Sequence, residues 1–454
     1  MNLPPLTAGF VGFGEVNSPR DLIERKCLAA QQALIAQGVQ LVATDPVCDD
    51  PEGVNEARAR RELARQDFDV LVVCLAGWIP SHTVLDVIMP FVHKPVVLWG
   101  LTGAYEEGRL VTTADQAGTT ALRDAVDALG FKFVYIYDTP DAPYAAAAKA
   151  VRFCETARAA ALLRTARVGM VGYRDMKLHV TLLDALSLRK LIGPEIETIE
   201  LLEIAQRMEK IPAAEIVPWL QIIRRDWQFN RPPEDATLER GIRLYLAVMQ
   251  KVKERGYQAV SLIDVDGVKK LLGFPPAMAL MLLADHGGLA TIPENDVPGA
   301  VTQLIVRYLT GQVGAYFEFY EFMTDRLLVG VPDYVPAEVV DGAVQVMLAK
   351  FGELSEGVLN VSKVKTGRVT LCRLASRGDR YRMHIVTGEA VTPRKWEEAG
   401  WTQPAPQLPG LEVILDCPVD DFAQKVLGQH YILAYGDQRQ RLVDWCKLLG
   451  VDVI

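Results

Sequence analysis

The chain has 454 residues, and at about 150 residues per domain this length predicts roughly three domains. Half of the residues are hydrophobic and 23% are charged, a composition typical of globular proteins that excludes long disordered or fibrous segments. The formal net charge is −9 and no stretch is strongly basic, which argues against nucleic acid or an anionic membrane surface as a partner.

The cysteines and the hydrophobic runs indicate the cellular setting. Seven cysteines are widely scattered, and an odd number without close spacing predicts neither a disulfide framework nor a zinc knuckle. No positive leader precedes the first hydrophobic stretch, as it would in a secretory signal. No uncharged hydrophobic run approaches the roughly 18 residues of a membrane-spanning helix. We therefore expect a cytoplasmic protein without a membrane partner.

The first part of the chain alternates short hydrophobic runs with amphipathic segments. This alternation predicts a parallel sheet covered by helices on both faces, and five strand–helix units suffice for a doubly wound, flavodoxin-like domain. We assign this domain to residues 1–164. Its expected strands are residues 7–13, 39–43, 69–76, 94–99 and 131–137.

The turn after the first expected strand matches a dinucleotide-binding fingerprint only in part. Gly12 and Gly14 occupy the first two glycine positions, but Asn17 stands where the third glycine belongs. Asp45 follows the second strand later than the acid of that motif, which comes about 20 residues on. We interpret the segment as an ordinary strand-to-helix turn, and a nicotinamide-dependent oxidoreductase ranks last among the functions considered.

The rest of the chain predicts a second α/β domain and then a change of character. Residues 165–345 form the second domain, with expected strands at 166–173, 195–204 and 258–264 and a first helix at 179–192. From about residue 355 the strands follow one another without long helices, which predicts an antiparallel sheet or small barrel in residues 346–454. The fold class is therefore α/β: two doubly wound α/β domains followed by a β-rich, small barrel-like C-terminal domain.

Two glutamates are expected at the same sheet edge. Glu294 lies in the segment PENDVPGA, just before a predicted helix with Pro298 in its first turn. About 13 helical residues at 1.5 Å each descend roughly 20 Å. About six strand residues at 3.3 Å each return the chain by the same distance. Glu318, in the strand AYFEF, then arrives near the edge that Glu294 left. Ligands of α/β sheets bind at that edge.

Two carboxylates that converge on a hydrophobic edge repel each other unless a metal ion lies between them. The alternative is structural: Glu294 caps its helix and Glu318 forms an ordinary ion pair. Spacing alone does not separate the two interpretations. His430, in GQHYILAYGD, lies at the start of a hydrophobic run, where a single histidine is usually structural. No HExxH, GxSxG or P-loop motif is present, so these enzyme classes are excluded.

These segments resemble the L-fucose/L-arabinose isomerase superfamily, with the fucose isomerase-like branch as the closest part. The similarity rests on PENDVPGA, the following strand AYFEF, the C-terminal QHYILAYGD, and VGMVGYRDMKL with IGPEIETIELLEI within residues 168–204. The predicted order of two α/β domains and a β-rich domain agrees with that family. Its specific motifs cover about three dozen residues.

The resemblance implies a metal-dependent aldose–ketose isomerase, an intramolecular oxidoreductase of carbohydrate metabolism. By position, the metal ligands fall on Glu294, Glu318 and His430, and the two glutamates are also the catalytic acid and base. A metal ion stabilises the charge of the cis-enediol, while the carboxyl groups move the proton between carbons 1 and 2. This donor set suits Mn²⁺, with Mg²⁺ as the alternative. Asp296 is either a substrate-binding residue or a partner that orients a ligand.

The same resemblance implies a homo-oligomer, a hexamer or smaller, in which the N-terminal domain caps the active site of a neighbouring subunit. The loop AGWIPSH supplies Trp78 and His82 as candidate sugar-binding residues at such an interface. A tryptophan packed in the interface without touching sugar is the other interpretation.

Three departures from the family pattern leave the substrate open. Pro293 replaces a frequent cysteine, Glu318 replaces a common aspartate, and residues 329–336 differ from a His-Cys-Gly-like loop. An isomerase for an anionic, for example sulfonated, sugar is therefore an alternative, and Arg224, Arg225 and Arg231 are candidate anion contacts. The remaining alternatives are a catalytically degenerate homologue and a non-enzymatic sugar-binding protein.

Overall fold

The computed structural model describes residues 3–331, 334–350, 354–378, 380–394 and 409–454. The chain forms two compact units, the first ending at Ala161 and the second beginning at Leu162. Among the described residues, no helix has the length and apolar character needed to cross a membrane.

The first unit is built on a five-stranded parallel sheet. In sheet order, its strands are β2 (Val39–Ala43), β1 (Leu6–Phe13), β3 (Val70–Leu75), β4 (Val96–Gly100) and β7 (Phe133–Tyr137). This is the predicted flavodoxin-like winding, in which the strand order reverses beside the first strand. All six residues of β3 are buried, which requires that both faces of the sheet are covered.

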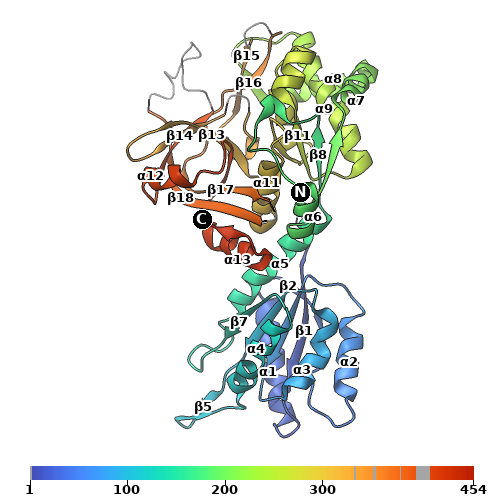
Figure 1. Cartoon of the computed structure of the whole chain (residues 1–454), viewed down its shortest axis with the longest axis vertical. Helices are drawn as coiled ribbons and strands as arrows, with labels where there is room; N and C mark the ends of the chain where they lie inside the picture. Colours follow the sequence, from blue (N-terminus) through green and yellow to red (C-terminus); the bar gives the residue numbers. More distant parts are fainter. Residues whose placement is uncertain (1–2, 332–333, 351–353, 379, 395–408) are drawn as a thin grey trace. The chain divides into compact units, whose positions relative to one another are not determined.

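Helices provide that cover, and the unit also contains a small hairpin (Figure 1). The helices are α1 (Arg20–Ile35), α2 (Val54–Leu63), α3 (Ser81–Ile88), the short 3₁₀ turn η1 (Met89–Phe91) and α4 (Asp115–Ala128). Helix α5 (Ala147–Thr165) follows and continues past Ala161 into the second unit. The hairpin consists of β5 (Ala104–Glu106) and β6 (Arg109–Val111), and all of their residues are exposed. This hairpin was not predicted from the sequence.

A second parallel sheet opens the second unit. In sheet order, its strands are β9 (Glu195–Ile199), β8 (Arg167–Val171), β11 (Ala259–Leu262) and β12 (Ala290–Ile292). Here too the order reverses beside the first strand, and all pairings are parallel. The helical segments between these strands and after them are η2 (Asp175–Lys177), α6 (Ala185–Leu191), α7 (Leu201–Lys210), α8 (Ala213–Asp226), α9 (Asp235–Arg255), the π-helix η3 (Asp264–Leu272), α10 (Ala277–Asp285) and α11 (Val297–Thr310).

Among the described residues, six antiparallel strands close into a barrel in the C-terminal region. In barrel order, they are β17 (Gly367–Arg377), β20 (Tyr431–Tyr435), β13 (Ala315–Phe322), β14 (Leu327–Gly330), β19 (Gly410–Leu415) and β18 (Arg380–Val391). Pairing of β17 with β18 closes the ring, and β21 (Asp452–Val453) adds alongside β18. The predicted small barrel is confirmed, but β13 and β14 come from the segment assigned by sequence to the second domain.

A small sheet and further helical segments complete the second unit. The sheet contains β10 (Trp227–Phe229), β15 (Val344–Ala349) and β16 (Gly357–Asn360). The helical segments are η4 (Ala337–Val339), α12 (Val419–Lys425) and α13 (Arg439–Leu449).

Helix α11 connects the parallel sheet to the barrel (Figure 1). Every residue from Val297 to Leu309 is buried, as expected for a helix enclosed by other layers on all sides. It contacts β11 and β12 of the parallel sheet and β17 and β20 of the barrel. The N-terminus of this helix therefore lies where loops from both sheets meet.

Two element predictions in this unit were wrong at their boundaries. The strand expected at 195–204 ends at Ile199, and α7 takes the following residues because its buried Ile204 follows a helical rather than an alternating pattern. The helix expected at 179–192 begins only at Ala185, where the side chain of Asp184 accepts the backbone N–H of Ser187 and caps it.

Candidate functional site

Three loops gather at the carboxyl edge of the second parallel sheet. They follow β8, β11 and β12, and Asn295 joins them. Its backbone N–H donates to the carbonyl of Leu262 at 3.0 Å, and its side-chain Nδ2 donates to the carbonyl of Val171 at 2.9 Å. These bonds place the loop after β12 directly over the ends of the two neighbouring strands.

Glu294 occupies a strained position in this loop. Its φ is 62° and that of Asn295 is 49°, a left-handed conformation that residues other than glycine rarely adopt. The carboxylate of Asp264 holds the turn by accepting the backbone N–H of Glu294 at 2.9 Å. Such strain persists only where surrounding contacts enforce it, and it is concentrated at functional sites.

Glu318 lies on the barrel strand β13, and His430 lies immediately before the neighbouring strand β20. Strand β13 pairs with β20 through Ala315 opposite Leu433 and Phe317 opposite Tyr431. One step further along this register, Glu318 faces His430. From the sequence we expected the strand of Glu318 to return to the edge of the parallel sheet. It belongs to the barrel instead, and the barrel brings it to the same place.

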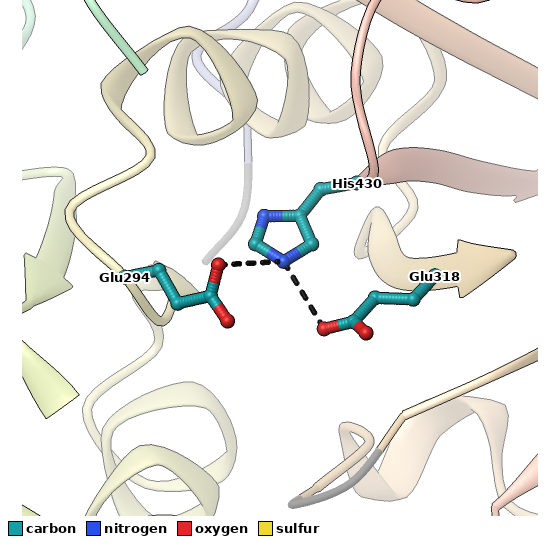
Figure 2. A group of neighbouring side chains, drawn as sticks. All are labelled: Glu294, Glu318 and His430. Carbon is teal, nitrogen blue, oxygen red and sulfur yellow. Dashed lines mark hydrogen bonds and ion pairs between the residues drawn. The ribbon is translucent and has the colours of Figure 1, made fainter. Parts of the chain in front are cut away.

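The three side chains converge on one point (Figure 2). His430 Nε2 lies 3.5 Å from Glu294 Oε2 and 3.3 Å from Glu318 Oε1. One potential ligand atom from each residue lies within 4.8 Å of the other two. Glu294 and His430 are buried, whereas the side chain of Glu318 is 21% exposed, so the cluster opens to solvent on the side of Glu318.

The cluster carries more negative charge than its surroundings neutralise. Burial raises the pKa of the Glu294 carboxyl to about 8, and repulsion from Asp264 and Glu318 adds to the rise against the opposing effect of His430. Burial alone would lower the pKa of His430, but hydrogen bonds to Asp296 and Glu318 outweigh it and raise the pKa to about 10. An excess of buried acid that retains protons in this way suits a bound cation.

The far side of the imidazole is fixed by Asp296. His430 Nδ1 lies 2.9 Å from Asp296 Oδ2, and the same carboxylate caps α11 by accepting the N–H of Gly299 at 3.0 Å. Burial would raise the pKa of Asp296, but the guanidinium of Arg373 and the imidazole hold it well below its usual range. Glycine is required at 299 because a Cβ there would lie 2.6 Å from Asp296 Oδ2.

Sequence reasoning missed several groups around the cluster. Gln429 Nε2 donates to Glu294 Oε2 at 2.6 Å, and Arg373 forms a buried ion pair with Asp296. The signal for Arg373 was an arginine within the hydrophobic strand GRVTLCRLA. Asp175 and Asp264 share a hydrogen bond, and burial together with this bond raises the pKa of Asp175 to about 6.

The other two predicted residues, Trp78 and His82, belong to the first unit. They follow the carboxyl end of β3, and both are exposed, Trp78 by 38%. Their roles in sugar binding stay predictions. The turn rejected as a nucleotide site has a packing explanation, because a Cβ at Gly12 would lie 2.3 Å from the Sγ of Cys27 on α1. In the loop 329–336, residues 332–333 lie outside the described residues.

Comparisons with known proteins point to sugar isomerases. No protein family model matches the chain. Sulfoquinovose isomerase of Alkalicoccus urumqiensis is 20% identical over 371 residues, which cover 79% of this chain and 80% of that protein. Sulfoquinovose isomerase of Priestia megaterium is 21% identical over 382 residues, covering 80% of each chain. L-arabinose isomerase of Shouchella clausii is 21% identical over 307 residues, covering 63% of this chain and 60% of that protein.

These relatives are isomerases of aldose sugars, so the chain is a distant homologue of enzymes of that class. The predicted relationship to sugar isomerases is confirmed at this level. The closer relationship to the fucose isomerase-like branch stays a prediction.

Proposed function

We propose that this protein is a metal-dependent aldose–ketose isomerase that acts on a free sugar through a cis-enediol. The observation that carries the proposal is the convergence of Glu294, Glu318 and His430, drawn from three separate segments, on one partly open point. The distant similarity to sulfoquinovose and L-arabinose isomerases supports the same reaction class.

The donor set fits a divalent cation. Two carboxylate oxygens and one imidazole nitrogen, with neighbouring acids that retain protons, form a hard and negatively charged site. This combination favours Mn²⁺, with Mg²⁺ as the alternative, and leaves room for sugar oxygens. When bound, the ion would polarise the sugar oxygens and stabilise the charge that develops on the enediol.

The two glutamates supply the proton transfer. One carboxylate takes the proton from carbon 2 of the aldose, and the electron pair of that C–H bond forms the double bond of the enediol as the aldehyde oxygen gains a proton. The proton is then returned to carbon 1 while the hydroxyl on carbon 2 loses its proton and becomes the ketone, so the proton released there balances the one gained by the aldehyde oxygen. Carboxyl oxygens within 4.8 Å of each other can serve two adjacent carbons, and the acid of one direction is the base of the reverse.

Exchange of solvent deuterium into the sugar tests this proposal. Metal-stripped protein is incubated in D₂O with a panel of aldoses, with and without Mn²⁺, and deuterium is measured at carbons 1 and 2. Mn²⁺-dependent exchange that disappears in Glu318→Gln supports the isomerase. Tight Mn²⁺ binding without exchange of any sugar would instead support a degenerate homologue.

An isomerase for an anionic sugar is the second candidate, because two of the named relatives act on a sulfonated sugar. The arginines suggested by sequence are already paired: Arg224 with Asp235, Arg225 with Asp226 and Arg231 with Glu356. A further candidate is the part-buried Arg174, whose backbone lies beside the loop of Glu294, because the carbonyl of the preceding Tyr173 accepts a hydrogen bond from Asn295.

The two substrates are separated by kinetics on a neutral and a sulfonated aldose. For the sulfonated sugar, Arg174→Met should raise KM by roughly tenfold or more, as loss of a charge-assisted hydrogen bond does. Arg231→Met is the matched control and should leave KM unchanged. Equal effects of Arg174→Met on both sugars would refute anion recognition by Arg174.

The oligomeric arrangement is also a proposal. We propose a homo-oligomer, a hexamer or smaller, in which the first unit caps the site of a neighbouring subunit. Light scattering coupled to size-exclusion chromatography measures the size directly, and a monomer at working concentration would refute it.

A further inference from the structure

Arg373 reaches the site from the wall of the barrel. It lies on β17, and its side chain is fully buried, 0% exposed. The guanidinium forms an ion pair with Asp296, in which Nη2 donates to Oδ1 at 2.9 Å and Nη1 donates to Oδ2. Nη1 also donates to the backbone carbonyl of His430 at 3.0 Å. One side chain therefore holds both the carboxylate that orients the imidazole and the backbone that carries it.

The carboxylate of Asp296, held by Arg373, in turn orients the imidazole of His430 through a hydrogen bond. An ionised carboxylate only accepts hydrogen bonds, so the bond at 2.9 Å requires that His430 Nδ1 carries a hydrogen. Nε2 is then the nitrogen left to face Glu294 and Glu318. Metal-ligating histidines depend on such a partner for ring orientation and for choice of the ligating nitrogen.

The backbone before His430 packs against the guanidinium of Arg373, and β17 has a further hydrogen bond to α11 that does not involve this guanidinium. A Cβ at Gly428 would lie 3.3 Å from Arg373 Nε, so the loop before His430 passes directly against the arginine. Strand β17 is held against α11 independently, because the N–H of Leu374 donates to Thr302 Oγ1 at 3.0 Å. Loss of the guanidinium therefore removes the support of the imidazole and leaves a second tie between β17 and the helix.

We propose that Arg373 is a positioning residue that, through Asp296, fixes the orientation and the Nδ1–H form of His430 and thereby sets metal affinity at the cluster. The inference about metal affinity rests on the proposed function, whereas the inference about the imidazole does not. Arg373 touches neither the cluster centre nor, in this proposal, the sugar.

Two measurements on the metal-free protein test the proposal. The first follows the imidazole Nδ1–H of His430, which is 1% exposed and should give a slowly exchanging, downfield proton resonance, assigned to this residue by its absence in His430→Gln and to Nδ1 by its ¹⁵N correlation with the ring. The second measures the dissociation constant of Mn²⁺ by competition with a chelator. We expect Arg373→Met to abolish the resonance and to weaken Mn²⁺ binding by about 10- to 100-fold.

Three further variants separate positioning from folding. Arg373→Lys keeps one donor and should restore part of the affinity. The double variant Asp296→Asn with Arg373→Met removes both buried charges, so it should stay folded and still bind Mn²⁺ weakly. Glu412→Gln breaks the Arg326–Glu412 pair, also in the barrel, with side chains 19% and 5% exposed. It should change stability but leave the Mn²⁺ dissociation constant within about twofold of that of the unmodified protein.

The outcomes distinguish this proposal from the proposed function. A retained Nδ1–H resonance in Arg373→Met, or unchanged Mn²⁺ affinity in that variant, would overturn the positioning role. If the unmodified protein binds no Mn²⁺ and Arg373→Met still loses the resonance, the metal-dependent function fails while the positioning of His430 stands.

Discussion

The two parallel sheets of this protein have the same winding but differ in the charge at their carboxyl edges. In the first unit, the acids at this edge have partners: Asp115 forms a buried ion pair with Lys26, and Asp138 accepts a hydrogen bond from Trp99 Nε1 at 2.9 Å. In the second unit, Glu294 accepts a hydrogen bond from Gln429 Nε2 at 2.6 Å, and the imidazole of His430 lies between Glu294 and Glu318.

The two sheets show that the winding of a sheet does not determine which charged side chains lie at its carboxyl edge. Winding places loops at the carboxyl edge of both sheets, as it does in open α/β proteins generally. In the second unit another layer, the barrel, brings a carboxylate and an imidazole to the edge beside Glu294. An edge whose acids are spaced apart and individually bonded can serve as a scaffold, whereas an edge where two carboxylates and an imidazole converge has the character of an ion site.

The largest expected effect is the loss of isomerase turnover when a carboxylate is removed from the carboxyl edge of the second sheet. Glu318→Gln should lower isomerase turnover by roughly 10²- to 10⁴-fold, because it removes an acid–base group and a proposed metal ligand. Steady-state kinetics with the sugar identified by deuterium exchange measure the loss. The matched control is Glu321→Gln on the same strand, which should retain turnover. Equal activity of Glu318→Gln and the unmodified protein would contradict the assignment.

A substitution at the carboxyl edge of the first sheet should lower the free energy of unfolding and leave Mn²⁺ binding unchanged. Lys26→Met leaves the carboxylate of Asp115 buried and unpaired, which should lower the free energy of unfolding by about 3–5 kcal/mol. Urea denaturation measures this change. Lys26→Met combined with Asp115→Asn should recover most of it. Loss of Mn²⁺ binding in folded Lys26→Met would show that the two edges are not independent.

The pH dependence of the metal-free protein should reveal the uncompensated acid. The pKa of Glu294 is raised from 4.5 to about 8, and that of His430 from 6.5 to about 10, so protons bind the folded state more tightly than the unfolded one. Their contribution is full below the unfolded values and is lost as pH rises through about 8 and then about 10.

Calorimetry in the presence of a chelator measures this loss. As pH rises from the unfolded pKa values to the folded values of about 8 and about 10, the free energy of unfolding should fall by several kcal/mol, at roughly 1.4 kcal/mol for each unit of pKa shift. Glu294→Gln should flatten the lower part of the curve. A stability that rises with pH in the metal-free protein would contradict the charge imbalance at this edge.

The smallest expected effect concerns the exposed residues of the first edge. Trp78→Ala should lower the free energy of unfolding by about 1–2 kcal/mol, because the residue is only 38% exposed and the substitution removes its buried apolar contacts. If the first unit caps a neighbouring site, the same change should raise the KM for sugar by roughly three- to tenfold. Leu28→Ala, at an exposed position of α1, is the control. An unchanged KM in Trp78→Ala would argue against sugar contact by this edge.

Much of the layer structure could be predicted from local patterns. Buried strands such as β3 stand out as continuous hydrophobic runs between turns, and the strand order of the first sheet follows from the alternation of strand and helix. A boundary was missed where a strand pattern changes to a helical pattern without a turn signal between them, as between β9, which ends at Ile199, and α7, which begins at Leu201. The exposed hairpin of β5 and β6 has no buried face, so no hydrophobic alternation marked it.

Local patterns were sufficient to name the residues that could form the site, because Glu294, Glu318 and His430 stand in segments whose composition predicts sheet edges and strands. The meeting of these segments depends on tertiary packing, since β13 lies in the barrel beside β20, a pairing between residues more than a hundred positions apart. Tertiary packing also decided that Arg373 supports Asp296 from β17. Local periodicity shows which face of a helix or strand is buried. The charged side chains that are buried against that face come from distant segments, so they cannot be read from the local pattern.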